Sequence, residues 1–164
     1  MSDIRDYKFY INQGIDLTNK GEFDDALVAF DKAIELNSNA ELAYFSKGIA
    51  YHNLNQLQAA YESYSKAIEL NPKMIDAYFN RAQSILAFDD PDEAELGKAL
   101  SDLKKAIELD ENFLDAYYYA AVVMKKLGQY DEAVKYLDIV IAKDPMAVYS
   151  KALKKLILQK YLNK

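Results

Sequence analysis

The chain has 164 residues, of which 51% are apolar and 28% are charged, and this balance excludes an intrinsically disordered protein. It contains no cysteine, which excludes disulfides, thiolate zinc sites and cysteine nucleophiles. Residues 1–145 carry 15 basic and 26 acidic side chains, and such an acidic body argues against a nucleic-acid groove, which needs clustered lysine and arginine.

Aromatic and small residues recur along the chain at a fixed interval. The positions of four tyrosines differ by 34, 34 and 39: Tyr10, Tyr44, Tyr78 and Tyr117. The positions of four alanines differ by 34, 39 and 34: Ala26, Ala60, Ala99 and Ala133. One insertion of five residues between Tyr78 and Ala99 accounts for the departures. A period of this length is typical of stacked supersecondary units.

In chain order, the pattern predicts four helix–turn–helix units and a terminal helix. Their ranges are residues 7–40, 41–74, 75–113 and 114–145, with the terminal helix at about 146–162. In the second unit, Gly48, Ala60 and Ala67 are small enough to let the two helices approach closely. Because an isolated hairpin cannot bury its apolar stripe, neighbouring units must stack, and we expect residues 1–164 to form a single domain.

The insertion AFDDPDEAEL lies between the two helices of the third unit. Asp90 followed by Pro91 predicts an N-cap and a first helical residue, so the second helix of this unit should start about one turn early. The alternative is a calcium loop, but the spacing of such loops is absent, and we expect no metal.

The terminal segment repeats a helical stripe, formed by Tyr149, Ala152, Leu153 and Leu156. Beyond it, four apolar residues predict more apolar surface than one neighbouring helix covers: Ile157, Leu158, Tyr161 and Leu162. Two alternatives stay open for this end of the chain, a disordered terminus and self-association.

No arrangement of residues predicts catalysis. His52 is the only histidine, and we expect it to be a solvent-facing helix residue rather than a general base. The five glycines form no phosphate-binding loop. We therefore predict that the protein is not an enzyme and holds no cofactor and no metal.

The sequence also predicts where the protein resides. No apolar run approaches the roughly 18 residues that span a bilayer. Residues 1–10 lack the basic and apolar regions of a secretory signal. We expect a cytoplasmic protein without membrane partners. Residues 146–164 contain five lysines and no acid, which indicates either a solvated face or a contact for an acidic partner.

Over residues 7–145 the repeated aromatic, Gly, Tyr, Ala and Pro positions resemble the tetratricopeptide repeat (TPR) family. The departures are local: Gln13, Lys47, Arg81 and Ala120 replace a leucine of the family pattern, and Ser38 and Glu111 replace a proline. The resemblance implies an all-α, right-handed α-solenoid of four TPR hairpins with a C-terminal capping helix. It also implies a concave groove, lined by the first helix of each hairpin, that holds a peptide.

The resemblance implies that residues one, two and five places after each repeated tyrosine face this groove. The three columns are Ile11, Phe45, Phe79 and Tyr118; Asn12, Ser46, Asn80 and Tyr119; and Ile15, Ile49, Gln83 and Val122. Whether Ile15, Ile49 and Val122 bind or only pack between helices stays open. Lys126, with three further lysines, would give the groove a basic end that attracts an acidic flank: Lys125, Lys151 and Lys154.

The predicted function is a non-catalytic scaffold that binds a peptide or an amphipathic helix of another protein. The alternative is a module that forms homo-oligomers through its apolar C-terminal helix. Some family members clamp a chaperone's C-terminal carboxylate with lysine, arginine and asparagine. The corresponding positions here are Ile11, Ile15, Asp76 and Asn80, which have no cation and argue against that role.

Overall fold

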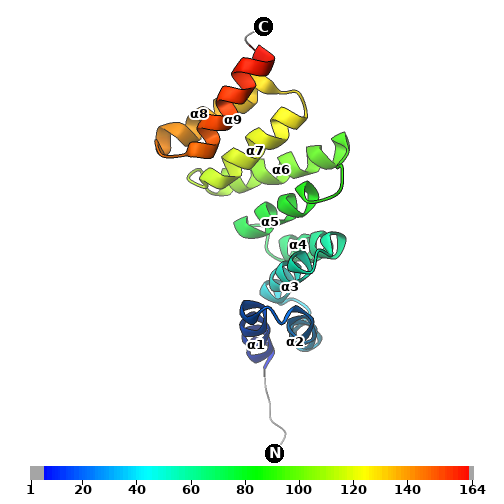
Figure 1. Ribbon diagram of the computed structural model, residues 1–164. Helices are drawn as coiled ribbons and strands as arrows, with labels where there is room; N and C mark the ends of the chain where they lie inside the picture. Colours follow the sequence, from blue (N-terminus) through cyan, green and yellow to red (C-terminus); the bar gives the residue numbers. More distant parts are fainter. Residues whose placement is uncertain (1–5, 163–164) are drawn as a thin grey trace, which may run out of the picture. The chain divides into compact units, whose positions relative to one another are not determined.

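The computed structural model describes residues 6–162, and every regular element in this range is helical. The predicted all-α fold is therefore confirmed (Figure 1). Residues 1–5, half of the stretch in which no secretory signal is predicted, lie outside the described residues, as does Lys164 of the basic C-terminal segment.

The helices fall into two compact units, residues 1–88 and 89–164. The first unit contains α1 (Tyr7–Lys20), α2 (Phe23–Leu36), α3 (Glu41–Asn53), α4 (Leu57–Leu70) and α5 (Ile75–Leu86). The second contains α6 (Glu93–Leu109), α7 (Leu114–Lys126), α8 (Tyr130–Lys143), α9 (Val148–Ile157) and a π-helical turn, η1 (Leu158–Leu162).

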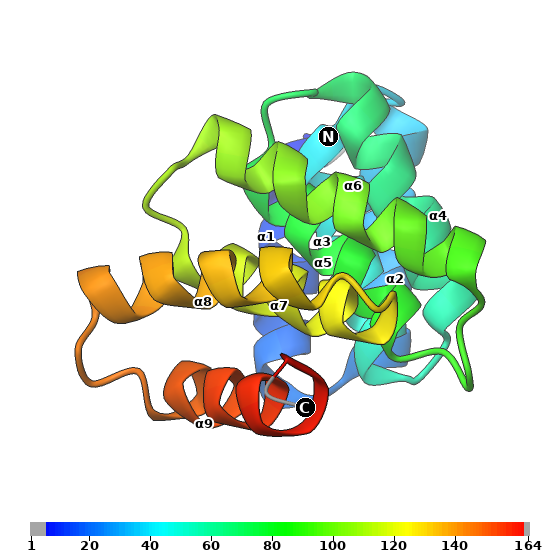
Figure 2. The same cartoon turned by 90° about the horizontal axis from the view of Figure 1, so that it is seen from above.

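Within each unit, helices that follow one another in the chain pack together. In the first unit α1 pairs with α2 and α3 with α4, while α2 also contacts α3, α4 contacts α5, and α1 contacts α3 (Figure 1). In the second unit α6 packs on α7, α7 on α8, and α8 on α9 (Figure 2). The third predicted hairpin takes α5 and α6 from different units, so this hairpin and the single-domain organisation stay predictions.

The hairpins close tightly because glycine faces an aromatic ring. A Cβ atom built on Gly48 of α3 would lie 2.5 Å from Cε1 of Tyr64 on α4. The equivalent atom on Gly14 of α1 would lie 2.4 Å from Cε1 of Phe30 on α2. Both rings are fully buried, as is Ala60 beside them. The predicted close approach of helices at small residues is thus confirmed in these two hairpins.

The insertion lengthens α6, but it does so with a different cap from the predicted one. Helix α6 begins at Glu93, six residues before Ala99, whereas α2, α4 and α8 begin three residues before the alanine of the same column, which confirms the early start. The N-cap is Asp92 rather than Asp90. Asp92 Oδ1 accepts from Glu95 N at 2.7 Å, and Glu95 Oε2 accepts from Asp92 N at 2.9 Å. Asp90 instead adopts a left-handed conformation with φ of 55°.

Each repeat ends in the same side-chain turn, which the sequence analysis missed. A carboxylate or amide oxygen accepts a hydrogen bond from the backbone N–H two residues later, at distances of 2.9–3.1 Å, in Asn37, Asn71, Asp110 and Asp144. These positions follow the intervals of the alanine column, although proline follows only two of them. An Asx turn of this kind competes with helical bonding, so it ends the helix without proline.

The register of the terminal helix differs from the predicted stripe. Ser150 is 3% exposed and Ile157 is fully buried, whereas Tyr149 is 79% exposed. Ser150 lies one full repeat after the buried Ala116, and Ile157 lies one full repeat after the buried Val123. The helix therefore keeps the ordinary repeat. The stripe based on Tyr149 is wrong because Tyr149 lies 32 residues after Tyr117, two positions short of the ordinary interval of 34.

The apolar surface of this end also lies elsewhere than predicted. Ile157 is buried, Leu158 and Leu162 are half-buried, and the Tyr161 ring stacks on Tyr130 of α8 with centroids 4.3 Å apart. The exposed apolar side chains of the C-terminal segment, as far as it is described, are Met146, Val148, Tyr149 and Leu156.

Candidate functional site

The predicted binding residues of the first unit lie on α1, α3 and α5, and two of them are buried. Ile11 is 4% exposed because it packs against Ala33 and Ala43. Ser46 of α3 is 6% exposed. These two side chains leave little surface for a peptide, so their main role is in packing.

The remaining residues of the first unit keep some exposure. Asn12 is exposed, and six side chains are half-buried: Ile15, Phe45, Ile49, Phe79, Asn80 and Gln83. Ile15 packs against both core clusters around α1. The Phe45 ring lies 5.8 Å from the Tyr64 ring, and Asn80 Nδ2 donates to the Asp76 carbonyl at 2.8 Å. Ile49 and Gln83 likewise keep part of their side chains accessible.

A pocket of about 290 Å³ lies where the N-terminal ends of α1 and α3 meet. We call it the N-terminal pocket; it is lined by Tyr7, Lys8, Ile11, Asn12, Ala40, Glu41 and Leu42. Of the predicted site residues, it brings together only Ile11 and Asn12. Lys8 supplies positive charge at its mouth, with Nζ 6.0 Å from the Tyr7 ring centroid.

A second pocket of about 290 Å³ lies in the second unit, between the N-terminal ends of α7 and α9. We call it the tyrosine pocket, after Tyr118, Tyr119 and Tyr149, which line it with Asp115, Asp144 and Ser150. The Tyr118 and Tyr119 rings meet edge to face, with centroids 5.3 Å apart. Burial, together with the neighbouring phenols of Tyr119 and Tyr149, raises the pKa of Tyr118. At neutral pH the Tyr118 phenol is therefore uncharged.

The other predicted residues of α7 lie outside this pocket. Val122 is half-buried and Lys126 is exposed. The predicted basic end is weaker than expected, because Lys154 forms an ion pair with Asp138 and Lys151 Nζ donates to the Pro145 carbonyl at 2.5 Å.

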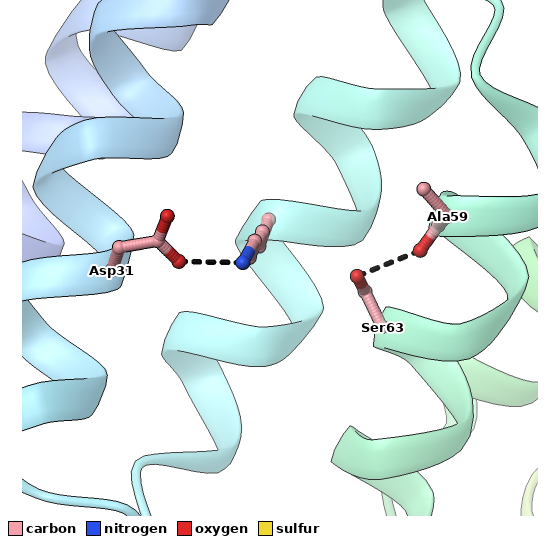
Figure 3. Close-up of polar contacts among 4 residues, drawn as sticks. Asp31, Ala59 and Ser63 are labelled. Atoms are coloured by element: carbon pink, nitrogen blue, oxygen red, sulfur yellow. Dashed lines mark hydrogen bonds and ion pairs between the residues drawn. The ribbon is translucent and has the colours of Figure 1, made fainter.

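Basic side chains tie the second helix of one repeat to the first helix of the next. Lys47 Nζ donates to Asp31 Oδ1 at 2.5 Å across α2 and α3, which Figure 3 shows beside the hydrogen bond from Ser63 to the Ala59 carbonyl. Three such contacts share one sequence interval: Lys47–Asp31, Arg81–Ser65 and Lys154–Asp138. Burial disfavours the ammonium ion of Lys47, but Asp31 and then Tyr51 outweigh it and raise the pKa of Lys47. The cations that replace leucine are therefore structural links.

His52 is not the solvent-facing residue that the sequence suggested. It is half-buried, and its Nδ1 lies 3.3 Å from Oγ of Ser84, a fully buried serine of α5. Burial lowers the pKa of His52. Ser84 Oγ donates to the Asn80 carbonyl at 3.1 Å, so it is free to accept a hydrogen bond from the imidazole. His52 thus connects α3 to α5 in its neutral form.

Among residues 6–162, no helix has the length and apolar character needed to cross a membrane. Within the same range, no three His, Asp or Glu side chains gather in a group that could hold a metal ion.

Comparison with sequence families gives three matches. Residues 14–55 match the family described as TPR repeat, and residues 42–74 match the family described as tetratricopeptide repeat. Residues 77–163, more than half of the chain, match the family described as regulator of microtubule dynamics protein 1-3. No curated protein sequence matches the chain significantly.

Solved structures resemble the chain over most of its length. A MamA protein is 24% identical with a TM-score of 0.85, covering 93% of this chain and 81% of its own. YrrB, described as a TPR protein with an unusual peptide-binding site, is 25% identical with a TM-score of 0.83, covering 94% and 77%. The first TPR of Spaghetti (RPAP3), bound to the HSP90 peptide SRMEEVD, is 20% identical with a TM-score of 0.70, covering 77% and 96%.

Proposed function

Because this chain belongs to the tetratricopeptide repeat proteins and, over residues 77–163, to the family of regulator of microtubule dynamics protein 1-3, we propose that it is a non-catalytic interaction scaffold. It binds a peptide or helix of another protein on the surface of its first helices. Two similar structures are described with a peptide-binding site or a bound peptide, which supports a ligand of this kind.

The observation that carries the proposal is the half-buried row on α3 and α5. Ile49, Phe79 and Gln83 each keep part of their surface accessible, although the residues that follow Ile49 and Gln83 in the chain, Ala50 and Ser84, are fully buried. Apolar side chains that remain accessible beside amides suit an apolar or amphipathic peptide. A clamp for a chaperone's C-terminal carboxylate does not fit this chain, because the positions that would form it hold Ile11, Ile15, Asp76 and Asn80, which have no cation.

A capture experiment with a matched control tests this proposal. Ile49→Glu places a charge in the row on α3, whereas Val28→Glu places the same charge on α2, where Val28 is 55% exposed. Proteins captured from native lysate by the unaltered chain should be lost with Ile49→Glu and retained with Val28→Glu. Helicity and melting of both variants should match the unaltered chain. Loss of stability in Ile49→Glu would show that Ile49 is a core residue instead.

The family matched by residues 77–163 names a first partner to examine. Its description refers to microtubule dynamics, so we propose microtubules as a candidate partner of this chain. Co-sedimentation of the full chain with polymerised tubulin tests this directly. A chain that stays in the supernatant at every tubulin concentration would remove microtubules from the proposal and leave the scaffold role intact.

Self-association is the second candidate, and the exposed C-terminal side chains favour it. Met146 is 80% exposed and Val148 is 68% exposed, and Leu156 of the same segment is 44% exposed. Exposed apolar residues that lie together commonly mark an interface. Light scattering over a dilution series should show a concentration-dependent mass that disappears when Met146 and Val148 are replaced by Lys. A constant monomer mass at high concentration eliminates this candidate.

A further inference from the structure

The N-terminal pocket and the tyrosine pocket occupy the same position in the repeat but differ in chemistry. Each lies where the N-terminal ends of two successive first helices meet. Six lining residues of the N-terminal pocket have a counterpart in the tyrosine pocket at a constant offset of three repeats and the insertion, which pairs Lys8 with Asp115, Ile11 with Tyr118, Asn12 with Tyr119 and Leu42 with Tyr149, whereas Glu41 and Asp144 each line one pocket alone. The backbone makes the pocket, and these substitutions decide what it holds.

We propose that the tyrosine pocket binds a basic side chain, lysine or arginine, of a partner polypeptide. Three tyrosine rings line one wall, and the faces of such rings carry negative electrostatic potential that attracts cations within about 6 Å. Asp115 and Asp144 supply formal negative charge at the same cavity. The N-terminal pocket has a lysine, an isoleucine and a leucine at the matching positions, and Lys8 balances the charge of its one acidic residue, Glu41, so it lacks the net negative charge of the tyrosine pocket.

The two carboxylates of the tyrosine pocket form no ion pair within the described part of the unit. Neither Asp115 nor Asp144 forms an ion pair with any residue in the described range 6–162; Asp144 Oδ1 accepts only from Met146 N at 2.9 Å. The nearby lysines of α9 are engaged elsewhere, Lys151 with the Pro145 carbonyl and Lys154 with Asp138. A cation from outside the unit is therefore the group that completes this pocket.

The size and surroundings of the pocket agree with such a ligand. A cavity of about 290 Å³ accommodates one long side chain rather than a folded element. The whole chain has a formal net charge of −6 at pH 7, so a basic peptide is attracted to the chain before it docks. The inference rests on the proposed scaffold function and specifies the chemistry of one residue of the partner.

Peptide titration of the full chain tests the inference. The probes are acetylated tripeptide amides Gly-Xaa-Gly in which Xaa is lysine, trimethyllysine, arginine or norleucine, a neutral analogue of lysine without the ammonium group. In ¹H–¹⁵N spectra, the three cationic peptides should shift the amides of Tyr118, Tyr119 and Ser150, and norleucine should not. Equal shifts with norleucine would overturn the proposal, because the pocket would then recognise only an apolar chain.

Two variants with little risk to the fold complete the test. Tyr149→Leu and Asp115→Lys each install the residue of the N-terminal pocket, and both positions are exposed. Each should weaken binding of the lysine peptide by about tenfold. Lys8→Asp serves as the matched control and should leave it unchanged. Undiminished binding in both pocket variants would overturn the inference. Ile49→Glu alters the first unit, whereas the peptide titration reports on the tyrosine pocket of the second unit. If the unaltered chain captures partners but does not bind the lysine peptide, only the pocket proposal fails. If it binds the peptide but Ile49→Glu does not reduce capture, only the proposal for the first unit fails.

Discussion

Lys47 and Asp31 lie on different helices of successive repeats, yet the lysine Nζ lies 2.5 Å from the aspartate Oδ1. The lysine side chain is 19% exposed and the aspartate 53%. Lys47 Nζ also lies 5.5 Å from the centroid of the Tyr51 ring. The pair joins α2 of the first repeat to α3 of the second, a junction that the leucine of the family pattern would join by apolar packing alone.

This pair is expected to contribute modestly to stability. Replacing Lys47 by Met keeps the apolar stem but removes the charge, and the coupling energy with Asp31→Asn should be about 0.5 kcal/mol, since half of the aspartate faces solvent. A double-mutant cycle measured by urea unfolding gives this value. Lys66 and Glu69, an i,i+3 pair within α4, provide the control for a contact that joins no two helices. A coupling no larger than in that control would contradict the linking role.

Such links illustrate what the sequence could and could not predict. The period of tyrosines and alanines predicted the helical units, because core packing repeats with the backbone. The cross-helix contacts were missed, since the interval between their partners corresponds to no contact within a single helix. Lys47 and Arg81 were consequently taken only as departures from leucine.

The candidate site shows the same division. Groove positions based on the family pattern found Tyr118 and Tyr119 but missed Asp115, Asp144 and Tyr149. Tyr149 lines the pocket because α9 keeps the ordinary repeat interval, whereas Asp115 and Asp144 lie at the start of α7 and the end of α8, outside the predicted groove columns. A comparison of the first-helix ends of the first and fourth repeats was the signal in the sequence that could have found them.

Glycine at the helix contacts should be intolerant of a single methyl group. Gly14→Ala and Gly48→Ala press a Cβ atom against the fully buried rings of Phe30 and Tyr64, and each should cost about 1–3 kcal/mol. Gly97 of α6 has no atom within 4 Å of the added carbon, so Gly97→Ala should stabilise by about 0.5–1 kcal/mol. Thermal melting of the three variants tests the contrast. Equal effects at Gly48 and Gly97 would be incompatible with close helix packing.

Asp92, which caps α6, should contribute more to stability than Asp90, its neighbour in the insertion. Asp92→Ala removes the acceptor for Glu95 N and should lower the free energy of unfolding by about 1 kcal/mol. Asp90→Asn should be nearly neutral, because Asn tolerates the left-handed backbone that Asp90 adopts. Chemical unfolding followed by circular dichroism measures both. A larger loss of stability from Asp90→Asn than from Asp92→Ala would show that Asp90 is the N-cap instead.

His52 makes the stability of the first unit sensitive to mild acid. Its pKa in the folded chain is lowered by burial, so below the ordinary value of 6.5 the unfolded chain binds a proton more readily than the folded one. Stability is therefore lost as the pH falls from about 6.5 towards the folded-state pKa. His52→Gln keeps a polar side chain without this titration, and its free energy of unfolding relative to the unaltered chain should improve between pH 7.5 and 5.5. A pH-independent difference would refute the assignment.

The Asx turns at Asn37 and Asn71 make the connections between repeats locally independent and interchangeable. Each turn is made by one side chain and the backbone two residues later, so it needs no help from the rest of the fold. Removing residues 38–71 would join Asn37 directly to Pro72. Asn37 would then take the place of Asn71, and one whole repeat would be lost. Duplication or loss of whole repeats can thus proceed without inventing a new connection.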